Sequence, residues 1–72
     1  MPAGGTSDFE SLIERLRSIS EDLADRAIVV LSEASRAGET ERPAQEKALT
    51  TARRAVEKAI ATLVRLQGGE RD

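Results

Sequence analysis

Apolar residues recur at the spacing of an α-helix through the first half of the chain. The steps between them are almost all three or four residues, which is the period of a helix with one apolar side. This stripe comprises Leu12, Ile13, Leu16, Ile19, Leu23, Ala27, Val30, Ala34 and Ala37. Ser7 and Glu10 have the spacing of a capping box, and no Pro or Gly interrupts the stripe before Gly38. The pattern predicts a first helix over residues 6–37, ended by Gly38 in a left-handed conformation.

A second apolar stripe follows after a short break. It comprises Ala48, Leu49, Ala52, Ala55, Val56, Ala59, Ile60, Leu63 and Leu66. Thr40 is suited to cap this helix, and Pro43 then lies in its first turn, where a missing N–H costs nothing. We therefore expect a loop over residues 38–40 and a second helix over 41–67. Residues 1–5 and 68–72 are predicted to form a flexible N-terminal arm and a flexible tail.

The short loop predicts that the two helices lie antiparallel. The expected fold class is therefore all-α, an antiparallel two-helix hairpin with no further domain. The chain has one aromatic residue, Phe9, so its core must be built from Leu, Ile, Val and Ala, which suits close helix packing. The stripes align best when facing residue numbers sum to about 79, which sets Leu23 against Val56 and Asp25 near Arg54.

Each helix carries more apolar surface than one seam can cover. Residues 28–31 are four apolar residues in a row and span most of a helix circumference. Burying one extra aliphatic side chain contributes about 1.5–3 kcal/mol before entropy, which is large for so short a chain. We therefore expect a homodimer that forms a four-helix bundle. The predicted partner interface comprises Ile13, Ala24, Ile28, Val29, Leu31, Ala48, Ala55 and Ala59.

The composition does not favour catalysis or metal binding. The chain has no Cys and no His, so it lacks thiolates, the commonest metal ligand and the commonest general base near neutral pH. Glycine-rich phosphate loops and zinc-ligand spacings are missing as well. We predict no catalytic residue, no cofactor, no metal site and no small-molecule substrate, and we interpret the chain as a non-enzyme.

The charge pattern points away from membranes. The net charge is −2, the first residues carry no basic cluster, and the longest unbroken apolar run is residues 27–31. A bilayer-spanning helix needs about 20 apolar residues. We expect a cytoplasmic protein without a membrane partner.

Arg53, Arg54 and Lys58 form the most basic stretch and are the candidate nucleic-acid contacts. No aromatic residue interleaves them, and Glu57 lies in their midst. We therefore interpret them as a solvated face that pairs with acidic residues of the first helix.

Three further polar residues fall on or near the apolar stripes. We expect Arg26 to lay its stem along the core and to leave its charged end in water. Ser20 and Thr62 are expected to donate to backbone carbonyls of their own helices. Neither hydroxyl has a base beside it, so neither is interpreted as a nucleophile.

Three functions remain open at this point. The favoured hypothesis is a protein-interaction or regulatory module that acts as a homodimeric helical bundle. The alternative is an accessory subunit that docks its apolar helical face on a larger enzyme or complex. The third is a nucleic-acid binder that uses its second helix.

Overall fold

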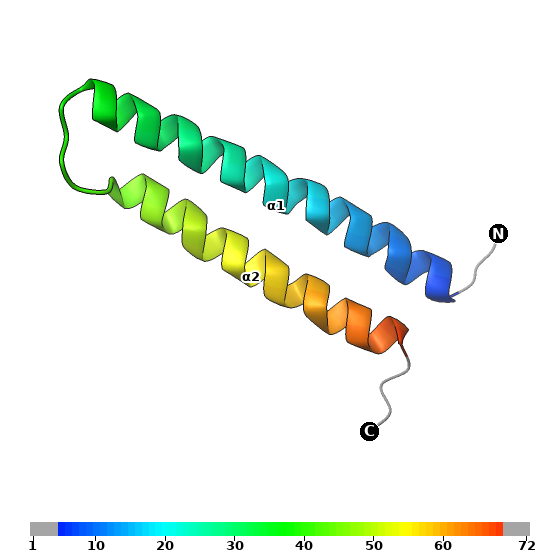
Figure 1. The fold of residues 1–72 in the computed structure, drawn as a ribbon. Coiled ribbons are helices and arrows are strands. Elements are labelled where there is room, and N and C mark those ends of the chain that lie inside the picture. The colour runs from blue at the N-terminus through cyan, green and yellow to red at the C-terminus, as the bar shows by residue number, and fades with distance from the viewer. Residues whose placement is uncertain (1–4, 69–72) are drawn as a thin grey trace.

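The computed structural model describes residues 5–68 and contains two α-helices, α1 (Gly5–Arg36) and α2 (Ala44–Gln67). The helices lie side by side and run antiparallel, joined by residues 37–43 (Figure 1). The predicted all-α hairpin is confirmed. Except for Gly5, which begins α1, and Gly68, which caps α2, the predicted arm and tail lie outside the described residues.

Gly38 ends α1 as the sequence predicts. Its φ of 86° lies in the left-handed region that glycine tolerates best. The N–H of Gly38 donates to the carbonyl of Ser35, and the N–H of Glu39 donates to the carbonyl of Ala34, both at 3.0 Å. These two bonds form a Schellman motif, which satisfies carbonyls that the helix end would leave unpaired.

The other helix boundaries differ from the prediction. α1 begins at Gly5, one residue early, so Ser7 lies inside the helix and not at its N-cap. α2 begins at Ala44, three residues later than expected, and Pro43 is its N-cap in an extended conformation with ψ of 145°. The later start has a steric cause, because the residue before a proline is disfavoured in the helical conformation. Thr40 and Arg42 therefore stay in the loop.

The residues that pack between the helices follow a seven-residue repeat. On α1 the steps alternate between four and three, through Phe9, Ile13, Leu16, Ser20, Leu23, Ala27, Val30 and Ala34, all buried or half-buried. On α2 the same repeat runs through Glu46, Leu49, Arg53, Val56, Ile60, Leu63 and Gln67, of which only Arg53 is exposed. A spacing of 3.5 residues keeps one seam facing the partner helix, as in a coiled coil.

The helix register differs from the predicted one. Hydrogen bonds join Ser20 to Glu57 and Gln67 to Glu10, and both pairs of residue numbers total 77. A third bond joins Arg53 to Ser20, a total of 73, so the predicted register of 79 is wrong. Between the described residues no ion pair crosses from α1 to α2. Exposed ion pairs contribute under about 1 kcal/mol each, which is too little to set the register against packing.

The seam buries little. Ile13 and Ala27 are the only buried apolar residues in the described chain, at 5 % and 9 % exposed, and no large side chain is fully buried there. Two helices side by side make a single layer, so both of its broad faces are open. Neither described helix is long and apolar enough to cross a membrane.

Candidate interaction surface

Large apolar side chains lie exposed on both broad faces of the hairpin. In the described chain, those exposed by 40 % or more are Leu12, Ile19, Ile28, Val29, Leu31, Val64 and Leu66. We call the side that carries Leu12, Ile19, Val29 and Leu66, together with Ala48, Ala52, Ala55 and Ala59, the Ile19 face. We call the opposite side, with Ala24, Ile28, Leu31 and Val64, the Ile28 face. The helical period assigns residues to these sides, and the surface hollows described below agree.

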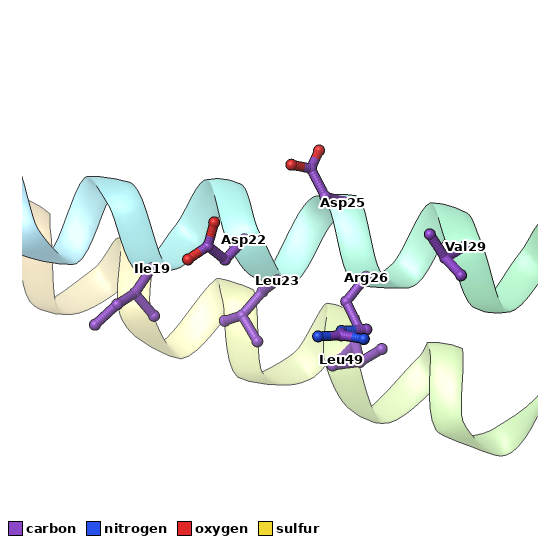
Figure 2. A pocket seen from close by; sticks show the side chains of 7 residues that line it. All are labelled: Ile19, Asp22, Leu23, Asp25, Arg26, Val29 and Leu49. Atoms are coloured by element: carbon purple, nitrogen blue, oxygen red, sulfur yellow. The ribbon is translucent and has the colours of Figure 1, made fainter.

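The Ile19 face is hollowed beside the seam (Figure 2). Ile19 and Leu23 extend from α1 toward α2, and Leu49 of α2 closes the hollow from below. Arg26 reaches from α1 across to Leu49, which agrees with the expectation that its stem covers the edge of the core. Asp25 points away from α2.

Alanines form the α2 part of the Ile19 face. Thr50 and Ala61 of α2 line hollows on the Ile28 face, so the helical period places Ala52 and its alanine neighbours on the other side of the seam. Ala48, Ala52, Ala55 and Ala59 are all exposed. Their small side chains allow the backbone of another helix to approach closely.

The Ile28 face is divided between an apolar and a polar end. Toward the loop, a hollow is lined by Ala24, Ile28 and Leu31 of α1. Toward the middle of the hairpin, the neighbouring hollow is lined by Arg17 and Glu21 together with a polar cluster from the seam. Charged groups therefore interrupt the apolar surface on this face.

The polar cluster consists of Ser20, Arg53 and Glu57. Ser20 is only 5 % exposed, and its hydroxyl donates a hydrogen bond to Glu57 Oε2 at 3.0 Å. Arg53 donates from Nε to the same hydroxyl at 3.3 Å and pairs with Glu57 Oε2 at 3.5 Å. The expectation that Ser20 bonds to a backbone carbonyl is therefore wrong, whereas Thr62 does donate to the carbonyl of Lys58, at 3.0 Å.

The candidate nucleic-acid contacts do not form one strip. Arg53 turns toward the seam and is held by Ser20 and Glu57, although about half of its side chain stays exposed. Arg54 and Lys58 are exposed on the outer side of α2. A phosphate backbone laid along α2 would therefore meet two of the three basic residues, with the carboxylate of Glu57 beside the third.

Glu46 is a buried carboxylate that the sequence pattern did not single out. It is 6 % exposed and accepts hydrogen bonds from Arg42 Nε at 2.7 Å and from Thr50 Oγ1 at 3.1 Å. The hydrogen bond from Arg42 lowers the pKa of Glu46 below its ordinary 4.5, burial opposes this shift, and Thr50 adds to it. The carboxylate thus fastens the loop residue Arg42 to the first turn of α2.

Acidification should weaken the hairpin through Glu46. Because the folded pKa lies below 4.5, this stabilisation is complete at neutral pH and is lost as the pH falls through the folded pKa. Glu46→Gln removes the titrating group, so it should unfold at lower urea concentration than the parent chain at neutral pH. The difference between the two urea midpoints should vanish in acid. A difference that is unchanged from neutral to acidic pH would contradict the role of the charge.

The predicted partner interface is divided by the structure. Ile13 lies in the seam, so it is not available to a partner of the folded hairpin, and Ala24 is half-buried. Ile28 and Leu31 lie on one face, whereas Val29 and the three predicted alanines lie on the other. Leu12, Ile19 and Leu66 were not assigned to the interface, yet they are exposed. Leu12 and Ile19 are seven residues apart on α1, and Leu66 continues the seven-residue spacing of Ala52 and Ala59 on α2. This spacing, offset from that of the seam, is the signal that distinguishes them.

Within residues 9–68 no three carboxylate side chains gather closely enough to hold a metal ion. Comparisons of the chain with protein-family models, with curated proteins and with solved structures found no match.

Proposed function

We propose that this chain is a non-enzymatic protein-interaction module that acts as a homodimer, with two hairpins forming a four-helix bundle. The observation that carries the proposal is the exposure of large apolar side chains on both faces of a single helical layer. Monomers seldom leave extended apolar surface in water, and such surface usually marks a site of protein association.

The free energy gained by covering this apolar surface is comparable to the stability of the folded chain. Covering one half-exposed aliphatic side chain contributes roughly 1 kcal/mol, about half of the value for full burial. Three such side chains on the Ile19 face of each copy (Leu12, Ile19 and Val29) therefore contribute an amount similar to the few kcal/mol expected for the stability of a chain this short. Association is thus large enough to decide whether the chain is folded.

Light scattering during size-exclusion chromatography tests the proposal. We expect a mass twice the monomer mass of 7.8 kDa, and a thermal midpoint that rises with protein concentration because dimerisation favours the folded state by mass action. A mass that stays at 7.8 kDa at every concentration, with a full helical circular dichroism signal, would contradict the homodimer.

The second candidate is an accessory subunit that docks on a larger protein. Ile28 favours it, because this residue is 61 % exposed and lies with Leu31 in an apolar patch at one end of the opposite face. The same light-scattering experiment separates the two candidates, since a subunit that needs a larger partner stays monomeric when it is alone.

A further inference from the structure

We infer that the second copy docks antiparallel on the Ile19 face, around a two-fold axis that passes α1 near residue 24. In this arrangement α1 packs against α1 of the partner, and facing residue numbers sum to 48. The inference rests on the homodimer proposed above and specifies its face, direction and register.

A two-fold interface requires a surface that complements itself, because each residue pair occurs twice across the axis. The exposed stripe of α1 on the Ile19 face meets this condition about residue 24. The two-fold rotation sets Asp22 of one copy against Arg26 of the other, so each carboxylate meets a guanidinium of the other copy. Ile19 and Val29 also exchange places, so an apolar side chain meets an apolar one. The four residues lie together in the hollow of Figure 2.

The same symmetry continues outward along the stripe. Arg15 lies seven residues before Asp22, and Glu33 lies seven residues after Arg26. These two residues exchange places under the same reversal and again bring opposite charges together. Beyond them, Leu12 meets the position of Arg36, whose aliphatic stem is able to cover it. No like charges face each other along this stripe.

The central charges are free to pair with another chain. Asp22 and Arg26 are exposed and lie four residues apart on α1. Neither forms a salt bridge with the other or with another residue of the described hairpin. Asp25 also lines the hollow, but its carboxylate points away from α2. The remaining pair of opposite charges, Asp22 and Arg26, matches a second copy of this hollow better than it matches a uniformly apolar or singly charged partner.

The α2 helix fits the same axis. The hydrogen bonds between the helices join residues whose numbers total 73 to 77, so the part of α2 level with residue 24 is near Ala52. Ala48 and Ala55 lie on either side of Ala52 on the Ile19 face. Small residues beside the axis let the two α2 helices approach closely while the α1 helices make the apolar and charged pairs.

The Ile28 face lacks this symmetry. Reversal of its α1 stripe about the same point sets Arg17 against Leu31 and Glu21 close to Ile28. The Glu21 carboxylate would then be desolvated against an aliphatic side chain, and no opposite charge would face either Arg17 or Glu21. About this axis the Ile28 face therefore lacks the opposite-charge pairs of the Ile19 face, although its apolar end is exposed.

Two charge reversals test the arrangement. Asp22→Arg places only positive charges around the axis, and Arg26→Asp places only negative ones. Each variant alone should dimerise at least about 10-fold more weakly than the parent chain, as measured by sedimentation equilibrium at low salt. An equimolar mixture of the two variants should form a heterodimer with close to the parent affinity, because opposite charges then face each other again.

The control is Glu21→Arg, an acid-to-base change on the same helix but on the Ile28 face, and it should leave the dimer unchanged. Circular dichroism verifies that every variant is helical. A parent chain that is monomeric overturns the homodimer itself. A dimeric parent whose two reversals dimerise normally overturns the Ile19 face and leaves the homodimer standing. Two weakened variants that do not recover on mixing overturn the two-fold arrangement.

Cross-linking provides a second measurement, since the natural chain has no cysteine. Ala52→Cys should form a disulfide-linked dimer under mild oxidation, because residue 52 lies near the axis. Ala61→Cys, on the same helix and facing the hollow of the Ile28 face, should remain mostly monomeric on a non-reducing gel. Faster cross-linking at residue 61 than at residue 52 would overturn the proposed axis.

Discussion

Ile13→Asp should abolish the helical fold of the chain at room temperature. Ile13 is the least exposed large apolar residue of the described hairpin, at 5 %. The substitution removes an aliphatic contact and introduces a carboxylate that has no partner in the seam, which costs about 3 kcal/mol or more. This loss is comparable to the whole stability of a chain of 72 residues. Circular dichroism at 222 nm, followed through a thermal melt, measures it.

Ile28→Asp is the matched control for this experiment. It makes the same chemical change on the same helix, but Ile28 is 61 % exposed and lies on the face that the proposed dimer leaves open. The control should retain the helical signal and melt within a few degrees of the parent chain. If Ile13→Asp melts like Ile28→Asp, the seam is not where the structure places it.

Ser20→Leu combined with Arg53→Leu should raise the thermal midpoint. The double change replaces the two seam residues of the polar cluster by aliphatic side chains and leaves Glu57 at the exposed edge of the seam. It makes the repeat of α1 fully apolar and leaves Glu46 and Gln67 as the polar positions of the α2 repeat. Replacing a buried polar group together with its partner by packed apolar residues often stabilises by about 1–4 kcal/mol. Because Ser20 borders an open hollow, the larger side chain has room. We expect the midpoint to increase by about 5 °C or more in a scanning calorimeter.

The single change Ser20→Ala separates burial from hydrogen bonding. It removes the hydroxyl that bonds to both Arg53 and Glu57 and adds no packing, so it should lower the thermal midpoint. A double variant that melts below the parent chain would show that the polar cluster contributes more than packing can replace. Loss of the polar cluster should also make the helix register less specific, since a uniformly apolar seam tolerates more than one register.

The period of the apolar residues was enough to predict the hairpin. Two stripes at helical spacing, separated by Gly38 and Pro43, predict two antiparallel helices, and Gly38 ends α1 in the expected left-handed conformation. The predicted start of α2 is three residues too early, because Pro43 disfavours a helical conformation at Arg42 more strongly than Thr40 favours a helix start as a capping residue.

The division between seam and surface was harder to predict. Leu12 and Ile13 are adjacent and both apolar, so a stripe three to four residues wide includes both. Only contact with α2 decides that Ile13 is buried and that Leu12 remains 41 % exposed. Ile19 and Ser20 are also adjacent, but here the polar residue lies in the seam and the apolar residue faces outward. Periodicity alone does not predict such an exchange, since it depends on Arg53 and Glu57 of the other helix.

Glu46 was missed for a related reason. An acidic residue in the first turn of a helix ordinarily interacts with the helix dipole while it remains in water. Here Arg42 and Thr50 supply hydrogen bonds that allow the carboxylate to be buried at a seam position. Those contacts arise from the path of the loop before Pro43, which the sequence pattern did not define.

The seven-residue spacing of the seam also affects how a partner must be shaped. A straight α-helix drifts by about 20° per heptad from a 3.5-residue repeat, so two helices that keep one seam must wind around each other with a left-handed pitch. Leu12, Ile19, Arg26 and Glu33 share this spacing, so the stripe on the Ile19 face winds with the hairpin. A straight partner helix packed on this stripe would lose contact with it within a few turns. A second hairpin has the same winding and stays aligned along this stripe.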